Sequence, residues 1–267
     1  HARGTTEVPA DPQRIVVLEP VQLDTAVALG RPPVGATVLS EKTGLPAYLG
    51  DSIEDTATVG RVPDPNIEQI AALDPDLILG TETRNGELYE SLSAIAPTVF
   101  MASHTDPWQD SVRVVADALG DPSGADRLLT AYEDRCDQVA AEFDTVGRTA
   151  QFVRPRNDLL TLYGPTSFAG STLECAGFTI PPRDWEDSIS VDLSPELAAE
   201  ARADLVLVSS TEPGDRGGTV PAAMAAYPDL FADLHLVDHS LWITGVGPLG
   251  GMAALDDLSR ILGTANQ

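Results

Sequence analysis

The sequence predicts an α/β protein of two Rossmann-like lobes with largely parallel sheets, joined by one long backbone helix. Short all-apolar runs alternate with helical patterns on both sides of one long amphipathic segment. Apolar runs of this kind are typical of parallel strands whose sheets are covered by helices on both faces. At 267 residues the chain is long enough for each lobe to bury its own core.

The joining helix is predicted over residues 121–143, DPSGADRLLTAYEDRCDQVAAEF. Asp121 or Ser123 can accept free N–H groups at its N-terminus, and Pro122 suits its first turn. Apolar residues at three- and four-residue steps form one stripe; they are Ala125, Leu128, Leu129, Tyr132, Cys136, Val139 and Phe143. The helix would be roughly 35 Å long. We therefore expect an N-terminal lobe at 1–120, the connecting helix at 121–145 and a C-terminal lobe at 146–267, with the function in the cleft between the lobes.

Strands and helices alternate in the first predicted lobe. Strands are expected at 14–18, 33–37, 77–79 and 98–101, and helices at 22–29, 66–73, 87–95 and 106–119. Residues 40–64 are rich in glycine and proline and are expected to be loop.

The second predicted lobe repeats the alternation after a hairpin. Strands are expected at 151–153, 159–163, 205–208 and 234–237, and helices at 167–176, 194–201, 220–227 and 249–262. Residues 155–158, PRND, predict the turn of the hairpin, and residues 181–190 are expected to be loop.

An internal repeat supports two related lobes. Residues 67–79 read IEQIAALDPDLIL and residues 195–207 read PELAAEARADLVL. Their superposition places Glu68 on Glu196 and Asp76 on Asp204. A capped helix followed by an aspartate and an apolar strand is common in α/β proteins, but these two copies lie on either side of the predicted long helix.

The charge excludes one large class of function. A net charge of −25 and a pI of 4.2 leave no basic surface for nucleic-acid phosphates. Solubility or a salt-rich habitat explains such a charge. No apolar run reaches the length of about 18 residues that a membrane span needs. The chain begins at His1 without an export signal, so we expect any such signal to have been removed or left out of this sequence.

The two cysteines leave two alternatives open. Cys136 and Cys175 lack the C-x-x-C spacing of a zinc site. In an exported protein they can form a disulfide, and otherwise they are two buried thiols.

Three segments carry a resemblance to a known family: HARGTTEVPADPQRIVVLEP, VGRVPDPNIEQIAALDPDLILG and LLTLYGPTSFAGSTLECAGF. The chain resembles the iron-siderophore solute-binding proteins of ABC importers, the helix-strut (class III) periplasmic binding proteins, which include the vitamin B12 and haem binders. The resemblance runs from about Gly4 to Leu262. It implies a monomer without cofactor or enzymatic activity, exported beyond the cytoplasmic membrane and either lipid-anchored on the cell surface or periplasmic.

The resemblance also implies a partner. In the family one glutamate of each lobe docks onto arginines of the membrane permease dimer, and the matching positions are Glu68 and Glu196. The alternative is that each glutamate only complements a helix dipole, which contributes about 0.3–1 kcal/mol.

Candidate ligand contacts follow from the carboxyl ends of the predicted strands, where α/β sheets bind ligands. Arginine forks and aromatic faces suit a ferric siderophore, whose oxygens keep partial negative charge around the iron. Arg84 and Arg154 are the strongest candidates. Arg156 comes third because it shares a strand face with Arg154. The other candidates are Tyr163, Arg183, Trp185, Trp242, His104 and Trp108.

Rival functions find less support in the sequence. The phosphate-binding glycine motifs and the G-x-S-x-G motif are missing, and His104, His235 and His239 are scattered. Haem would need an axial ligand such as His104 or Tyr163, and cobalamin would suit a more aromatic site. The protein itself is expected to hold no metal directly. Since the net charge disfavours a highly anionic chelate, we expect a hydroxamate or mixed-type siderophore.

Overall fold

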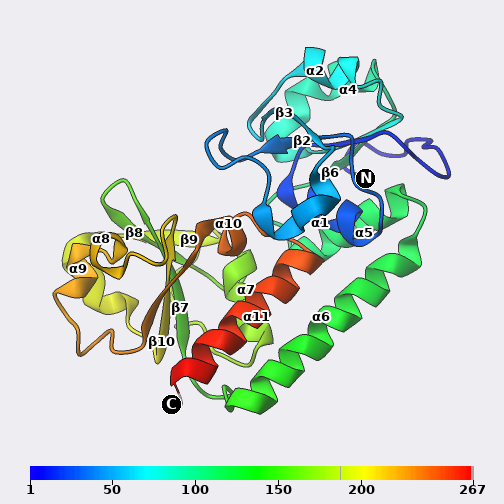
Figure 1. Cartoon of the computed structure of the whole chain (residues 1–267). Coiled ribbons are helices and arrows are strands. Elements are labelled where there is room, and N and C mark those ends of the chain that lie inside the picture. The colour runs from blue at the N-terminus through cyan, green and yellow to red at the C-terminus, as the bar shows by residue number, and fades with distance from the viewer. Residues whose placement is uncertain (187, 266–267) are drawn as a thin grey trace. The chain divides into compact units, whose positions relative to one another are not determined.

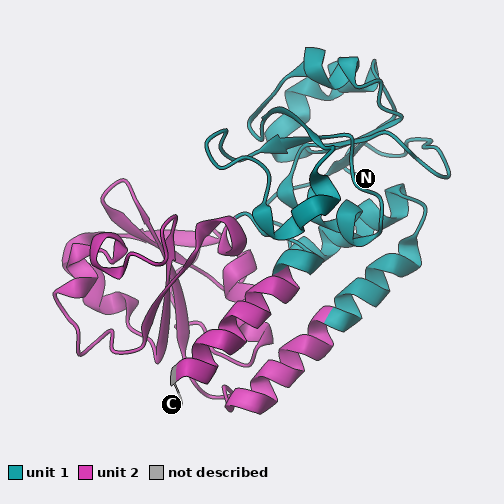
Figure 2. Ribbon diagram, viewed as in Figure 1, with its two compact units in different colours: residues 1–131, 244–250 teal, residues 132–243, 251–267 magenta. Residues whose placement is uncertain are grey.

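The computed structural model describes residues 1–186 and 188–265 and divides into two compact units (Figures 1 and 2). Unit 1 comprises His1–Ala131 and Thr244–Gly250, and unit 2 comprises Tyr132–Ile243 and Gly251–Gln267. Each unit contains its own sheet and helices, which confirms the two-lobed α/β prediction. The predicted long helix is α6 (Pro122–Phe143), a continuous helix of 22 residues.

Unit 1 is built on a six-stranded sheet of order β4-β3-β2-β1-β5-β6. The strands are β1 (Ile15–Val17), β2 (Gly35–Val38), β3 (Ala57–Arg61), β4 (Asp64–Pro65), β5 (Leu77–Thr81) and β6 (Thr98–Met101). All neighbouring strands are parallel except β3 and β4. β1 and β5 are buried throughout, which explains why both read as continuous apolar runs.

Short helices connect these strands. They are α1 (Pro20–Ala28), η1 (Ala47–Ile53), α2 (Ile67–Ala72), α3 (Glu82–Asn85), η2 (Gly86–Leu88), α4 (Tyr89–Ser93) and α5 (Trp108–Ala118). Residues 40–64, expected to be loop, contain η1, β3 and β4 instead. Gly60 has a φ of +98° where β3 turns back into β4, so the glycine that suggested a loop shapes a strand connection.

Unit 2 is built on a five-stranded mixed sheet of order β11-β10-β7-β8-β9. The strands are β7 (Ala150–Arg156), β8 (Leu159–Tyr163), β9 (Ser190–Leu193), β10 (Leu205–Ser210) and β11 (Leu234–Asp238). β10 is parallel to β7 and β11, while β8 is antiparallel to β7 and β9. Asn157 and Asp158 both have positive φ between the paired residues Arg156 and Leu159, so the expected hairpin turn is confirmed.

A disulfide bond joins two of the helices in unit 2. They are α7 (Phe168–Cys175), η3 (Pro195–Ala201), α8 (Arg216–Thr219), α9 (Ala222–Ala225) and α10 (His239–Trp242), and α11 (Pro248–Ala265) closes the chain. Cys136 of α6 and Cys175 of α7 form a disulfide, which decides between the two alternatives left by the sequence. Beside it, the Tyr132 hydroxyl donates to Thr172 Oγ1 over 3.1 Å, so a bond and a hydrogen bond join the two helices.

The internal repeat corresponds to one structural device used in each unit. Asp76 precedes β5, and its carboxylate accepts from the amides of Gln13 and Arg14 just before β1. Asp204 precedes β10, and its carboxylate accepts from the amide and hydroxyl of Thr149 just before β7. In both units the aspartate therefore ties the start of one parallel strand to the start of its neighbour.

A buried carboxylate holds the segment Thr244–Gly250 within unit 1. Asp24 of α1 accepts hydrogen bonds from the amides of Leu249 and Gly250, each over 2.8 Å, and from the Tyr48 hydroxyl over 2.7 Å. Gly247 passes so close that a Cβ would lie 2.5 Å from the Asp24 carboxyl carbon. Burial raises the pKa of Asp24 to about 7, although the hydrogen bonds from these three donors lower it. Asp24 thus caps the N-terminus of α11.

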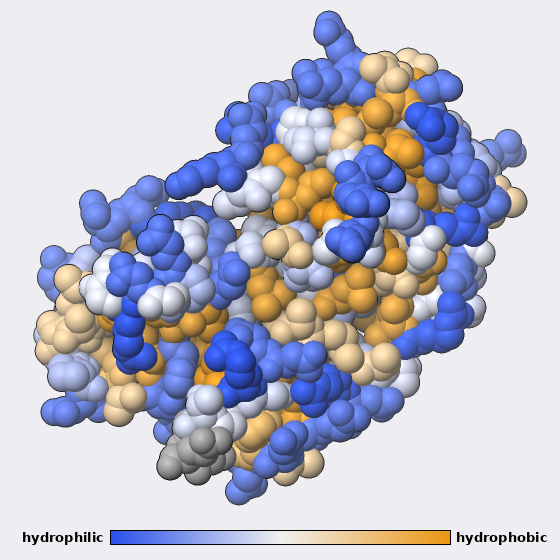
Figure 3. Space-filling model, viewed as in Figure 1, coloured by the Kyte–Doolittle hydropathy of each residue, from blue (hydrophilic) through white to orange (hydrophobic). Residues whose placement is uncertain are grey.

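The surface agrees with the composition. Hydrophilic side chains cover much of the face drawn in Figure 3, with smaller apolar areas between them. Among the described residues, no helix combines the length and the apolar character that crossing a membrane would require.

Candidate functional site

In unit 1 the candidate Arg84 lies beside a buried carboxylate. Arg84 sits on α3, directly after β5, and Glu19 lies two residues beyond the end of β1, the parallel neighbour of β5. Arg84 Nε lies 2.7 Å from Glu19 Oε1, and Glu19 is buried. Burial raises the pKa of Glu19 to about 7, opposed by the positive charge of Arg84. Within the described part of the chain, the terminal Nη atoms of Arg84 have no hydrogen-bond acceptor.

His104 belongs to the same group. It follows β6, the other neighbour of β5, and its Nδ1 lies 3.0 Å from the Thr83 hydroxyl oxygen on α3. Burial lowers the pKa of His104, the charge of Arg84 lowers it further, and Asp106 opposes both. The structure thus brings Glu19, Arg84 and His104 together at the carboxyl edge of the first sheet.

In unit 2 the candidate Arg154 lies near Tyr163. Both residues are half-buried, and Arg154 Nη1 lies 3.5 Å from the Tyr163 hydroxyl, at the limit of a hydrogen bond. The Tyr163 ring packs edge-on against Phe152, with ring centroids 5.4 Å apart. Among residues 1–186 and 188–265, no carboxylate lies within 4.0 Å of the Arg154 guanidinium. A half-buried cation without a counter-charge is unusual in so acidic a chain.

His239 completes the group in unit 2. It begins α10 directly after β11, and its Nδ1 lies 2.8 Å from the Ser209 hydroxyl oxygen at the end of β10. Burial lowers the pKa of His239, the charge of Arg154 lowers it further, and Asp238 opposes both.

The two groups share one construction. Each has an arginine, a histidine and a hydroxyl that meets histidine Nδ1, and each lies at the carboxyl ends of parallel strands. His239, Ser209 and Thr83 were not among the candidates from the sequence. The rule that ligands gather beyond carboxyl strand ends would have selected His239, because it directly follows a predicted strand.

Two candidate arginines are engaged with other protein groups. Arg156 is exposed, and its Nη2 lies 3.6 Å from an Asp192 carboxylate oxygen. The side chain of Arg183 is 16% exposed; it donates to the Glu200 carbonyl and lies 3.9 Å from the Glu200 carboxylate. Burial lowers the pKa of Arg183. The contacts of Arg183 fix the loop before β9 onto η3.

The three tryptophans differ in exposure. Trp242 has no exposed surface: its Nε1 donates to Asp257 over 2.9 Å and its ring stacks on Phe152. Trp108 is also buried, at the start of α5. Trp185 is half-buried and lies on Gly164, where a Cβ would come within 2.8 Å of the indole. Trp185 packs on the sheet face of Val153 and Leu162, whereas Tyr163 and Arg154 lie on the opposite face.

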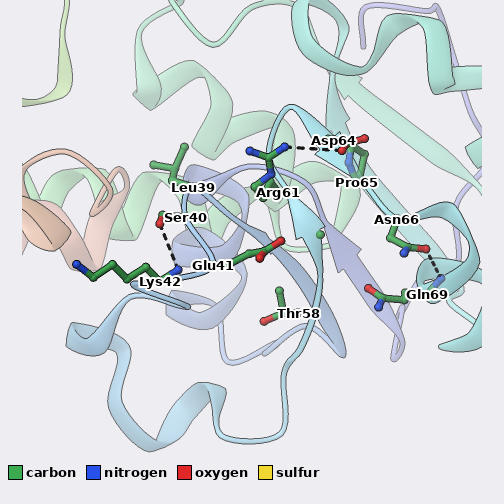
Figure 4. Close-up of a pocket in the computed structure, with 11 residues that line it drawn as sticks. Leu39, Ser40, Glu41, Lys42, Thr58, Arg61, Asp64, Pro65, Asn66 and Gln69 are labelled. Atoms are coloured by element: carbon green, nitrogen blue, oxygen red, sulfur yellow. Dashed lines mark hydrogen bonds and ion pairs between the residues drawn. The ribbon is translucent and has the colours of Figure 1, made fainter. Parts of the chain in front are cut away.

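A surface pocket of about 810 Å³ lies in unit 1 and is lined by residues of β3 and β4 and of the segment that follows β2 (Figure 4). Its charged lining residues are Glu41, Lys42, Arg61 and Asp64. Arg61 already lies 3.8 Å from Asp64. Two cations and two carboxylates balance each other, so this pocket offers no excess of positive charge to an anionic ligand.

The two glutamates of the internal repeat are both exposed and lie in first turns. Glu68 is in α2, whose N-terminal Asn66 side chain accepts from the Gln69 amide over 3.0 Å. Glu196 is in η3, and hydrogen bonds from Ser194 and from its own backbone amide lower its pKa. Neither carboxylate is paired with a cation in the described parts of the chain.

No three His, Cys, Asp or Glu side chains of the described residues are grouped so that they could hold a metal ion.

Comparison with known proteins agrees with this geometry. The family model described as periplasmic binding protein matches residues 15–233. The chain belongs to the periplasmic binding protein family.

Relatives within this periplasmic binding protein family have named ligands. A probable siderophore-binding lipoprotein of Bacillus subtilis is 29% identical over 97% of this chain and 85% of its own length. A Fe(3+)-citrate-binding protein of Bacillus subtilis is 30% identical over 78% of this chain and 67% of its own length. The crystal structure of Staphylococcus aureus SirA complexed with staphyloferrin B superposes with a TM-score of 0.82 and 29% identity, and covers 98% of this chain and 97% of that one.

Proposed function

We propose that this protein is an extracytoplasmic solute-binding protein that captures a ferric siderophore and delivers it to the permease of an ABC importer. The observation that carries the proposal is the half-buried guanidinium of Arg154, which has no carboxylate partner among the described residues. The names of the relatives, a siderophore-binding lipoprotein and a Fe(3+)-citrate-binding protein, support the ligand class and a place outside the cytoplasmic membrane.

The chemistry of the two groups suits such a chelate. The oxygens that bind Fe(III) keep partial negative charge, and guanidinium N–H groups donate charge-assisted hydrogen bonds to them. Arg84 and Arg154 both have N–H groups that no described acceptor fully uses. Tyr163 adds aromatic surface beside Arg154 for the organic part of the chelate.

Fluorescence titration tests the ligand class. Trp242 stacks on Phe152, which packs against Tyr163, so we expect ferric citrate or ferrioxamine to quench tryptophan emission in a saturable way. Ferric enterobactin, haem and cobalamin serve as rival ligands. Saturable quenching by haem or cobalamin alone would overturn the proposal in favour of another transport ligand, and chemical turnover of a chelate would make the protein an enzyme.

We also propose that Glu68 and Glu196 dock onto cationic groups of the permease. Both carboxylates are exposed, unpaired among the described residues, and carried by equivalent turns of the two units. Such a pair suits a partner made of two similar subunits.

Substitution separates docking from ligand binding. We expect Glu68→Ala and Glu196→Ala to leave ferric-chelate affinity unchanged and to lower the stimulation of permease ATP hydrolysis, with the double variant weakest. Glu90→Ala is the matched control, because Glu90 is another exposed glutamate in the first turn of a helix. Equal stimulation by the double variant and the control would exclude docking through these residues.

A further inference from the structure

One face of the unit 2 sheet carries a row of polar residues. Arg154 of β7 lies opposite Thr161 of β8, and Thr161 lies opposite Asp192 of β9. Residues that lie opposite each other in paired strands point to the same face of the sheet, so these three side chains form one row. The preceding residue of β7, Val153, lies opposite Leu162, and both point to the other face and belong to the hydrophobic core.

Two donors hold Asp192 within this row. The Thr161 hydroxyl, which is buried, donates to Asp192 Oδ1 over 2.6 Å. Arg156, two residues beyond Arg154 on β7, places its Nη2 3.6 Å from Asp192 Oδ2. The side chains of Arg156 and Asp192 are 48% and 42% exposed, so a bound molecule can reach either of them. The carboxylate of Asp192 is thus engaged with Arg156 and oriented by Thr161.

Asp192 makes the two arginines of β7 unequal. Arg154 and Arg156 point to the same face, because they are two residues apart on one strand. Asp192 pairs with Arg156, but it lies two strands away from Arg154, which is about 10 Å across a sheet. Among the described residues no carboxylate lies within 4.0 Å of the Arg154 guanidinium. The described face therefore offers a ligand one arginine without a counter-charge instead of two.

We propose that Asp192 is a specificity-determining residue of unit 2, which holds Arg156 back from the ligand and thereby selects ferric chelates of low charge over chelates with several carboxylates. This inference rests on the proposed function, names the ligand class within it and needs residues of unit 2 alone. The oxygens of a hydroxamate chelate carry only partial charge, and one guanidinium suits them. A carboxylate that approaches β9 meets the negative charge of Asp192 instead. The expectation of a hydroxamate or mixed siderophore thus narrows to the hydroxamate class.

The substitution Asp192→Asn tests this role, because asparagine keeps an oxygen that can accept from Thr161 and loses the charge. Fluorescence titration compares the variant with the wild-type protein for ferric citrate and for ferrioxamine B, a hydroxamate chelate with a terminal ammonium. We expect affinity for ferric citrate to rise roughly three- to tenfold, since Arg156 becomes available and a negative charge is lost. Affinity for ferrioxamine B should stay the same or fall.

Two further variants show whether the place of Asp192 matters. Asp137→Asn removes the same charge from an exposed position of α6, so it should leave the ratio of the two affinities unchanged. The double variant of Asp192→Asn with Arg156→Gln removes the released cation and should return the affinity for ferric citrate to about the wild-type value. A gain that persists in the double variant would show that Asp192 does not act through Arg156, and the inference would be wrong.

The two proposals fail differently. If neither ferric chelate binds the wild-type protein, the proposed function is wrong. If a ferric chelate binds and the ratio of affinities in Asp192→Asn equals that in Asp137→Asn, the function stands and the inference about Asp192 falls.

Discussion

The two proposed arginines differ in what holds them before a ligand arrives. Arg84 already lies against Glu19, a buried carboxylate whose pKa is raised to about 7. Arg154 has only the distant hydroxyl of Tyr163 and no carboxylate among the residues described. A chelate must therefore share Arg84 with Glu19, whereas no carboxylate of residues 1–186 and 188–265 competes for Arg154. We therefore expect the two arginines to contribute differently to the free energy of chelate binding.

This difference predicts an order of effects. Arg154→Gln should weaken ferric-chelate binding by about 1.5–3 kcal/mol, the range for a hydrogen bond to a charged group. Arg84→Gln should weaken ferric-chelate binding less than Arg154→Gln does near neutral pH. The difference between the two variants should shrink at lower pH, because Glu19 becomes protonated and no longer holds Arg84. Fluorescence titration at two pH values measures both.

Arg113→Gln is the control for these variants, since Arg113 is an exposed arginine of α5 that forms an ion pair with Asp110. Unchanged affinity in both Arg84→Gln and Arg154→Gln would remove them from the site. Thermal unfolding of each variant shows whether a loss of affinity comes from a loss of fold.

At the scale of elements, the start of α11 depends on one buried side chain. Asp24 accepts three hydrogen bonds, two of them from the amides of Leu249 and Gly250 that a helix N-terminus leaves unsatisfied. The close approach of Gly247 leaves no room for a larger residue. The chain re-enters unit 1 only at Thr244–Gly250, so this cap fixes the whole returning segment.

Removing the cap should be costly. Asp24→Ala leaves three donors without an acceptor, of which the Gly250 amide is buried and the other two are part-buried, so we expect the free energy of unfolding to fall by roughly 3 kcal/mol. Asp24→Asn keeps one acceptor oxygen and should lose less. Urea unfolding compares the variants with Asp117→Ala, an exposed aspartate of α5 that should stay within about 0.5 kcal/mol of wild type. An Asp24→Ala midpoint equal to that of the control would show that the cap contributes nothing.

For the whole molecule, the net charge of −25 acts on ligand capture as well as on solubility. Only one lysine, Lys42, and a small set of arginines oppose 41 acidic residues. At long range the field repels an anionic chelate, while the arginines attract it only at short range. Salt screens the long-range part first.

The association rate should therefore depend on salt in opposite senses for two chelates. Between about 0.01 M and 0.15 M salt the screening length falls from about 30 Å to about 8 Å, so we expect anionic ferric citrate to associate several-fold faster at the higher salt. Ferrioxamine B carries a terminal ammonium and should associate more slowly there. Stopped-flow fluorescence measures both rates, and the same trend for both chelates would exclude long-range repulsion as the cause.

Much of the fold was predictable because local patterns carry it. The stripe of α6, the apolar runs of β1, β5 and β10, and the turn at Asn157 and Asp158 are properties of neighbouring residues. β3 and β9 were missed, because edge and near-edge strands that are only partly buried lack an apolar run. The pairing of Cys136 with Cys175 also stayed open, because the spacing of two cysteines in the sequence does not show whether their thiols meet in the fold.

By itself the sequence determined the two α/β lobes, the long helix and the arginines that follow strands, because periodicity and strand-end position are local properties. Only the tertiary structure decided that Glu19 forms an ion pair with Arg84 and that the Ser209 hydroxyl is hydrogen-bonded to His239. It also decided that Arg154 has no carboxylate partner among the described residues. These facts depend on which strands become neighbours in a sheet. Residues far apart in the chain meet there, and no local pattern records such a meeting.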